Sequence, residues 1–372
     1  MIPQWEQDII NSKQKKYIYS IEWLDKNEQV LDEVILDVVS GNMNFDGTKS
    51  NRRSASITLK NLDKKYTPKA SGVLWINNKV KIKCGYAYGD NQKLLYNKGT
   101  FVIGDPSILS SPSRKEITLE LHDKWVLLDG TISGKLQNKT IIPVGTRVDT
   151  AIKNLVTDLG KETKYIIDDC DYILPYTIEK QPNETIASII EEICFIVSYE
   201  SFYDDNGFFR FRKALMPKDY DVTPISWRYT SAGLYLQNIR DLKWTDVRNS
   251  IRVIGDTLSD GTTISAVVKD ESDSDLSIGK IGERTETIED NNIYTNALAL
   301  ERANYELKQK IMIAESLRTT IIPNYSHTVG DIIEIVDENN GTEGRYLIQT
   351  IDFGMSYDSV MNLGLWAIRD WR

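Results

Sequence analysis

The sequence is poor in the residues that carry metal-binding and nucleophilic chemistry. Its 372 residues include three cysteines and two histidines. Cys84, Cys170 and Cys194 are widely spaced and odd in number, so they predict neither a disulfide framework nor a CxxC metal site. His122 and His327 have no second His or Cys at ligand spacing, which argues against zinc. We therefore expect no metal, no cofactor and synthesis in a reducing compartment.

Long apolar runs and familiar catalytic motifs are also missing. No run of about 18 apolar residues occurs, so we expect no membrane insertion, and the N-terminus lacks the apolar core of a signal peptide. There is no P-loop, HExxH, Gly-x-Ser-x-Gly or Rossmann fingerprint. Carboxylate pairs at 168–169, 191–192 and 204–205 fall in expected loops or on a polar helix face. Solvated charge is the default there, so we expect no catalytic residue and no enzyme, although sequence alone leaves a glycosidase-like pair open.

Clustered positive charge is absent too. The net charge is −9 and basic residues are spread along the chain, which argues against a nucleic-acid-binding face. The negative charge serves solubility, or it lines a channel through which DNA slides. Arg52-Arg53 is a small basic spot that contacts phosphate, contacts a partner's carboxylate, or protects a strand edge. The acidic stretch 270–275 reads as a solvated loop, with calcium as the alternative, because it lacks the glycine and ligand spacing of an EF-hand.

What the sequence has in abundance is short runs of alternating apolar and polar residues. Such runs occur at 17–23, 55–59, 80–84 and 117–121, with turns between them. Period two over short segments predicts half-buried strands of a sandwich or barrel. Residues 1–16 are polar and lysine-rich, which predicts an arm or a frayed helix. We expect an N-terminal arm at 1–16 and a β-barrel domain at 17–135.

The pattern changes near residue 136. A helix is predicted over 146–160, opened by a capping-box-like Thr146–Asp149 and stopped by Gly160. A second helix is predicted over 183–197 with Asn183 as its N-cap, followed by a hairpin that turns at 205–207. Residues 136–235 thus predict a small α/β module.

Strands return in the last stretch, which we assign as a second β-barrel domain at 236–372 with one long helix over 294–310. Three segments there repeat the pattern of the first β domain: 80–82, 99–103 and 117–121 resemble 333–335, 344–348 and 361–365. Both copies contain Gly-x-aromatic-x-Ile. The repeat predicts that 17–130 and 236–372 superpose as related barrels. The alternative is that unrelated β-meanders share this spacing.

The order of these features resembles the baseplate hub family of contractile-tailed phages, phage-tail-like bacteriocins and type VI spike proteins, also called the late control protein D family. The segments that carry the resemblance are 39–59, 99–103, the helices and hairpin of the α/β module, 248–255, 279–284, 294–310 and 329–335. The resemblance implies a mixed, β-dominated fold with two related tube domains and an inserted α/β module. Because the chain ends soon after the last strand, it implies that any lytic activity belongs to another protein.

The resemblance also implies a function. Two tube domains per chain in a homotrimer make a pseudo-six-fold ring that joins a hexameric tail tube to a three-fold central spike. The implied partners are the tail tube or distal tail protein, the spike, the baseplate wedge proteins and the tape measure protein, with DNA passing through the lumen without specific binding. The implied location is the baseplate of a virion or tail-like particle, after synthesis in a bacterial cytoplasm.

Two alternatives stay open at this point. One is the N-terminal hub part of a tail-associated protein from a non-contractile tail. The other is a β-rich glycan-active or carbohydrate-binding tail protein.

Overall fold

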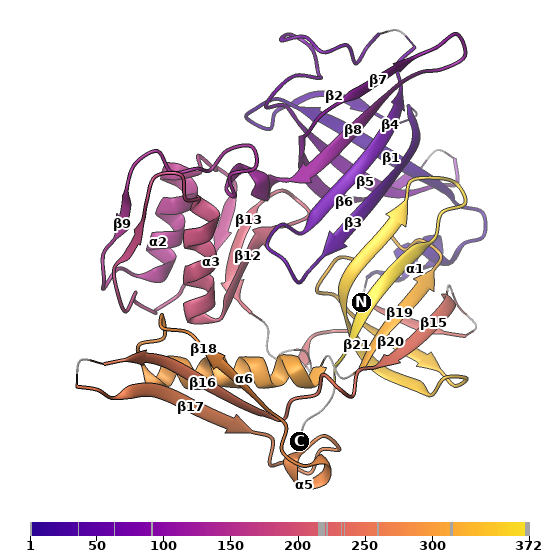
Figure 1. Cartoon of the computed structure of the whole chain (residues 1–372). Coiled ribbons are helices and arrows are strands. Elements are labelled where there is room, and N and C mark those ends of the chain that lie inside the picture. The colour runs from indigo at the N-terminus through magenta and orange to yellow at the C-terminus, as the bar shows by residue number, and fades with distance from the viewer. Residues whose placement is uncertain are drawn as a thin grey trace.

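The computed structural model describes residues 2–368 apart from 36, 63, 91, 215–219, 221, 232, 234, 259, 313 and 314. Its largest unit is a 14-stranded sheet with strands from both the N-terminal and the C-terminal parts of the chain. Figure 1 shows two curled β units, an α/β module beside the first, and a smaller layer of strands and helix below. The fold is β-dominated, as the sequence predicts. Residues 369–372 of the expected second domain lie outside the described residues.

The first barrel holds the strands that the alternating runs predict. They are β1 (Lys16–Leu24), β2 (Val30–Val34), β3 (Val38–Asp46), β4 (Arg53–Lys60), β5 (Lys79–Tyr88), β6 (Gln92–Ile103), β7 (Ser107–Ser110) and β8 (Lys115–Asp123). In β4, Ala55, Ile57 and Leu59 are buried while their neighbours face outward. The polar N-terminus includes a short helix, α1 (Gln4–Asn11), whose Ile10 is fully buried in the barrel's core cluster.

The α/β module has its own hydrophobic core. Its elements are the 3₁₀ turn η1 (Lys124–Leu127), β9 (Thr140–Ile142), α2 (Val148–Asn154), the π-helical turn η2 (Leu155–Leu159), β10 (Tyr165–Ile167), β11 (Ile178–Lys180), α3 (Ile186–Val197), β12 (Tyr199–Tyr203) and β13 (Phe209–Lys213). The predicted helices and the β12–β13 hairpin are present. Their predicted starts are wrong: Thr185, not Asn183, caps α3 by accepting from the N–H of Ser188, and no side chain caps α2.

The second barrel comprises β14 (Trp227–Thr230), β15 (Tyr235–Leu242), β19 (Glu315–Ile321), β20 (Ile332–Asp337), β21 (Thr342–Gly354) and β22 (Met361–Ile368). Between β15 and β19 the chain leaves the barrel and forms a separate layer. That layer comprises β16 (Ser250–Thr257), β17 (Thr263–Lys269), α5 (Ile278–Ile281), β18 (Thr285–Glu289) and α6 (Asn296–Met312). It has its own small core, in which Ala299, Ala303 and Leu307 of α6 pack beside Ile251 and Val253 of β16.

The core clusters show which segments pack together. Trp125 and Leu128 pack in the core of the α/β module, although they precede residue 136. Trp227 and Tyr229 pack in the core shared by the barrels, although they precede residue 236. The chain therefore passes from barrel to module close to the end of β8, and returns at β14.

Both barrels have the same order of neighbouring strands. The first runs β3-β4-β8-β6-β5-β1 and the second runs β15-β19-β22-β21-β20-β14. The order along the chain also matches, apart from β2, β7 and the layer inserted after β15. One difference is that β1 pairs antiparallel with β5, whereas β14 pairs parallel with β20. This shared topology supports the duplication that the repeat predicts.

The register of the repeated motif agrees in the two copies. In each, the glycine of Gly-x-aromatic-x-Ile lies opposite the second apolar residue of the preceding strand, and the aromatic lies opposite the first. The pairs are Gly99 with Ile82 and Phe101 with Val80 in one copy, and Gly344 with Ile335 and Tyr346 with Ile333 in the other. Because a slip of one residue would turn every side chain to the other face, this agreement is specific.

Candidate assembly interface

The cysteines and one of the two histidines lie inside the protein. All three cysteines are buried and free. His327 is buried, its Nε2 lies 2.7 Å from the hydroxyl of Tyr229, and burial lowers its pKa. His122 lies on β8 opposite Ser54. Within the described residues no group of three or more His, Cys, Asp or Glu side chains is placed to hold a metal ion, and no described helix is long and apolar enough to cross a membrane.

The two other candidates from the sequence behave differently from each other. Asp270 is buried and accepts hydrogen bonds from the hydroxyls of Ser272 and Ser274, so its carboxylate caps its own turn. Arg52 and Arg53 do not form an exposed basic spot, because both side chains are buried against carboxylates of the same chain. They also do not protect an edge, since β4 lies between β3 and β8.

The two arginines instead fasten the first barrel to the α/β module. Arg52 binds Glu200 of β12 at 2.5 Å, and its guanidinium lies 3.5 Å from the ring centroid of Phe202. Arg53 donates to the carbonyl of Tyr203 and binds Asp205 at 2.6 Å. Burial alone would raise the pKa of Asp205, but the nearby cations hold it below its ordinary value. The β12–β13 hairpin is thereby held against the start of β4.

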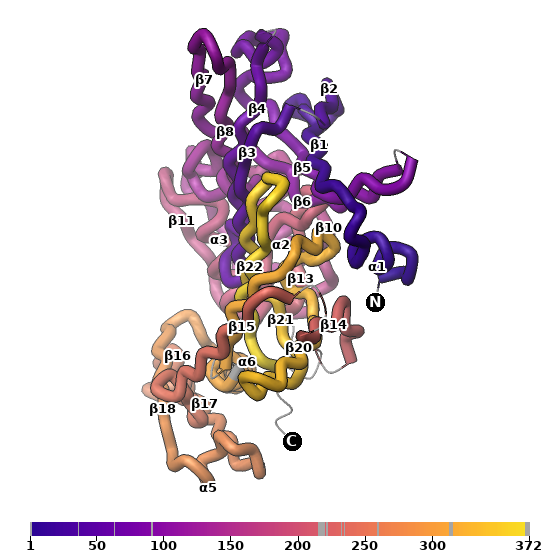
Figure 2. The backbone as a smooth tube through the Cα atoms, turned by 90° about the vertical axis from the view of Figure 1, so that its right-hand side faces the viewer, coloured from indigo at the N-terminus to yellow at the C-terminus, as the bar shows by residue number. Residues whose placement is uncertain are grey.

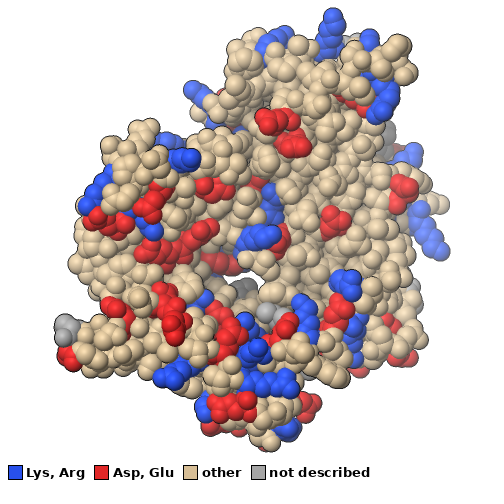
Figure 3. Space-filling model, viewed as in Figure 1, with Lys and Arg blue, Asp and Glu red and all other residues tan. Residues whose placement is uncertain are grey.

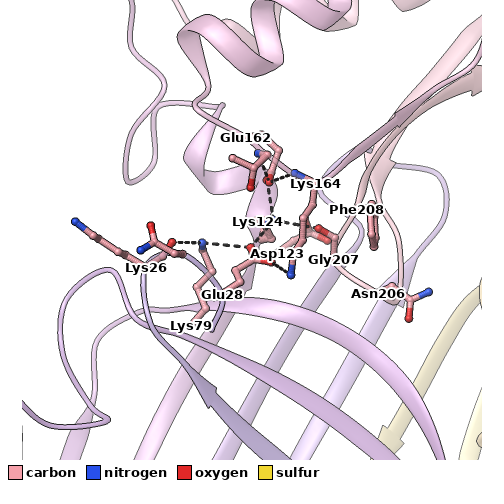
Figure 4. Close-up of polar contacts among 12 residues, drawn as sticks. Lys26, Glu28, Lys79, Asp123, Lys124, Glu162, Lys164, Asn206, Gly207 and Phe208 are labelled. Carbon is pink, nitrogen blue, oxygen red and sulfur yellow. Dashed lines mark hydrogen bonds and ion pairs between the residues drawn. The ribbon is translucent and has the colours of Figure 1, made fainter. Parts of the chain in front are cut away.

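Lys124 is the centre of a second set of contacts between the first barrel and the α/β module, shown in Figure 4. Its fully buried ammonium contacts Glu28 at 2.6 Å, Glu162 at 2.7 Å and the carbonyl of Gly207 at 3.0 Å. Glu28 comes from the β1–β2 turn, while the other two belong to the module. Burial acts to raise the pKa of Glu28, but Lys124 and its neighbouring lysines outweigh it and lower the pKa to about 2.

Lys98 connects the two barrels. It lies on β6 and is almost completely buried, and its ammonium donates to the carbonyl of His327 at 2.7 Å. Burial lowers its pKa. A sequence pattern gave no sign of Lys98 or Lys124 as buried cations, because a lysine in a strand or after one ordinarily faces solvent. At most, the sequence places both lysines next to residues whose side chains face inward.

A cavity of about 550 Å³ lies where the module, α6 and the barrels meet, and Figure 3 shows an opening at the centre of this face. Several of its charged lining residues pair with one another. Glu200 binds both Arg52 and Arg212, and Arg302 binds Glu306. Among the described residues this cavity is therefore a gap between subdomains in which Arg52, Arg212 and Arg302 are held by carboxylates of the same chain.

The barrels are also joined by strand pairing. β3 of the first barrel pairs antiparallel with the last part of β21, with Met43 opposite Phe353 and Asp46 opposite Thr350. Hydrogen bonds from Gly47 to Gln349 and from Met355 to Gly41 close both ends of this ladder, which we call the β3–β21 seam. The seam makes one continuous sheet of two barrels.

Two further edges carry exposed apolar residues. β7 pairs only with β8 among the described strands, and Ile108 and Leu109 are 50% and 44% exposed. Within the described part of the chain β15 pairs only with β19, and Leu236, Ile239 and Leu242 are exposed. Native proteins usually cover or charge such edges because they invite pairing with another chain. These two edges are the candidate assembly interface.

Comparison with known proteins places this fold. No protein-family model matches the sequence, and no curated protein matches it significantly. Solved structures do match. A tail protein from Neisseria meningitidis MC58 is 14% identical, with a TM-score of 0.64 over 94% of this chain and 96% of that one. The 43 kDa tail protein of prophage MuSo2 from Shewanella oneidensis is 12% identical, with a TM-score of 0.63 over 94% and 98%.

A third match extends the comparison to secretion systems. The Escherichia coli c3393 protein, described as a component of the type VI secretion system with structural similarity to bacteriophage T4 tail proteins gp27 and gp5, is 9% identical. Its TM-score is 0.55 over 90% of this chain and 74% of that one. The chain thus has the fold of phage tail and type VI secretion proteins, as its resemblance to the baseplate hub family predicts.

Proposed function

We propose that this chain is a non-enzymatic hub subunit of a phage tail or tail-like particle. Three copies would form a ring of six barrels between the hexameric tail tube and a three-fold spike. The observation that carries the proposal is the repeated strand order of two barrels that are joined edge to edge within one chain. Such a chain presents two similar units per copy, which is what a change from six-fold to three-fold symmetry requires.

The rigid fastening of the module supports this role. A hub transmits force, and the buried ion pairs of Arg53 and Lys124 hold the module to the first barrel at several points. The implied partners are the tail tube or distal tail protein, the spike, the wedge proteins and the tape measure protein. DNA would pass through an acidic lumen without specific contacts.

The mass of the assembled chain tests the proposal. Native mass spectrometry of the purified protein, across a concentration series, is expected to show a trimer of the 42.5 kDa chain. Assays against cell-wall glycan are expected to show no cleavage. A monomer that hydrolyses glycan would replace the hub with the glycan-active alternative.

A further inference from the structure

The β3–β21 seam pairs two strand edges within one chain. Each of these two strands has an equivalent elsewhere in the chain whose outer edge pairs with no described strand. β21 is long enough to pair with β20 through its first part and with β3 through its last part. In the first barrel the same path is split into two strands, β6 and β7. The strand register identifies the equivalent of each seam partner.

β7 is the equivalent of the last part of β21. The motif isoleucines Ile103 and Ile348 lie opposite Leu121 and Leu365, which are themselves equivalent. Beyond them, the register along β8 and along β22 shifts by one residue in both copies, between Ile103 and Ser107 and between Ile348 and Thr350. After this shared bulge, Ile108 lies opposite Ile117 and Phe353 lies opposite Met361.

β15 is the equivalent of β3. In the first barrel Met43 lies opposite Ala55, which lies opposite Leu121. In the second, Arg240 lies opposite Leu317, which lies opposite Leu365. Met43 therefore corresponds to Arg240 and Asn42 to Ile239. Both edges of the seam thus have a second copy in the chain, and both second copies are unpaired on that side among the described strands.

Resting on the proposed ring, we propose that β15 of one copy pairs antiparallel with β7 of the next, in the register of the β3–β21 seam. That register places Ile239 opposite Leu109, Arg240 opposite Ile108 and Lys243 opposite Asp105. It brings two exposed apolar side chains together and joins an ammonium to a carboxylate. Opposite charges and apolar pairs across strands both stabilise strand pairing.

The backbone directions agree with this pairing. The N–H of Ser111 donates to the carbonyl of Arg114, so alternate residues Leu109 and Ser107 turn their backbone groups toward β8. Ile108 and Ser110 then turn theirs outward, as Phe353 does toward β3. Pro106 departs from the repeat because it has no N–H, so the ladder is shorter than the β3–β21 seam and centres on Ile108.

The pairing is between copies and not within one. Figures 1 and 2 both show β7 at one end of the molecule and β15 in the other half, and Figure 1 shows β15 beside β19. Head-to-tail contacts of this kind form a closed ring when the rotation per copy closes. With one intramolecular and one intermolecular seam per copy, three copies give six barrels in one continuous sheet.

A cysteine pair tests the register. If the new ladder follows the hydrogen-bond pattern of the β3–β21 seam, Ile239 and Leu109 face each other as a non-hydrogen-bonded pair. The Cα atoms of such a pair lie about 4.5 Å apart, a separation that allows a disulfide. The native cysteines are all buried and so give no background. In the variant L109C with I239C, mild oxidation is expected to give covalent dimers and trimers on a non-reducing gel, and nothing larger. The control L109C with Q237C is displaced by two residues and is expected to stay uncrosslinked.

The outcomes separate the pairing from the ring. A trimer by native mass without crosslinking of L109C with I239C overturns this strand pairing and leaves the ring standing. Crosslinked chains that grow beyond trimers support the pairing and overturn the closed ring. A monomer without crosslinks overturns both. Equal crosslinking in the displaced control also overturns the register.

Discussion

At the scale of single residues, the strongest feature is the set of buried cations between subdomains. Replacing Lys124 with methionine keeps the side chain's length but leaves Glu28 and Glu162 buried without their shared cation. Breaking a buried pair in this way costs about 3–5 kcal/mol. We expect K124M to lower the free energy of unfolding by about 3 kcal/mol in a urea titration.

A matched control is Lys139, which pairs with Glu179 at the surface, where its side chain is 48% exposed. Exposed pairs contribute roughly 0–1 kcal/mol. K139M is therefore expected to change stability by less than about 1 kcal/mol. Equal effects of the two substitutions would show that the Lys124 cluster does not fasten the module.

The same cluster predicts a pH dependence. The pKa of Glu28 is held at about 2 in the folded chain, against 4.5 ordinarily. A depressed carboxyl pKa stabilises the folded state above the ordinary value, and this stabilisation is lost as pH falls toward 2. We expect the wild-type chain to lose roughly 2 kcal/mol of its free energy of unfolding through Glu28 as the pH falls from 4.5 to 2, after discounting for solvent screening.

The variant E28Q isolates that contribution. It has no charge to lose, so its stability between pH 4.5 and 2 is expected to fall less steeply than that of wild type. Chemical denaturation at several pH values measures the difference. Parallel curves for the two proteins would contradict the assigned role of Glu28.

Little of this residue-scale detail was visible in the sequence. Arg52-Arg53 stands in a polar run, and such a pair is usually exposed, so the sequence favoured an external role. Its true partners, Glu200 and Asp205, are about 150 residues away along the chain. Nothing in local pattern encodes which distant carboxylate meets which arginine.

At the scale of elements, the repeated motif makes a specific demand on glycine. Gly99 has a φ of +135°, and an added Cβ would lie 3.0 Å from the ring of Phe101 and from the side chain of Arg53. Side chains other than hydrogen are strained in that conformation, at about 1–3 kcal/mol. We expect G99A to destabilise the chain by that amount in a thermal or urea unfolding experiment.

Gly279 provides the comparison. It lies in α5, and a Cβ there would meet nothing within 4 Å. G279A is expected to change stability by at most about 0.5 kcal/mol. If G99A proves as mild as G279A, the glycine of the motif is not a structural requirement of the barrel.

Element types were predictable from sequence, whereas element ends were less so. Alternation identified the barrel strands because one face of each is buried. The start of α3 was placed at Asn183 because asparagine is a common N-cap, but Thr185 is also a favoured N-cap type and is the residue that accepts from the N–H of Ser188. Two suitable residues only two positions apart leave the choice to tertiary packing.

At the scale of the whole molecule, the sequence revealed only part of the repeat between the two barrels. The sequence showed three of the repeated segments, and the structure extends the shared order to six strands per barrel. The layer from β16 to α6 separates β15 from β19, whereas β3 and β4 are joined by a short turn. That insertion hid the remaining equivalence, since spacing along the chain no longer matched. The β3–β21 seam was also invisible, because it depends on how the barrels dock.

The central claim is that two like barrels in each chain build one six-barrel ring. Single-particle cryo-electron microscopy of the assembled protein tests it most directly. The account predicts a hollow ring with three-fold symmetry, in which six barrels alternate and every barrel contacts its neighbours through paired strand edges. A compact monomer, or a ring whose barrels number other than six, would contradict it.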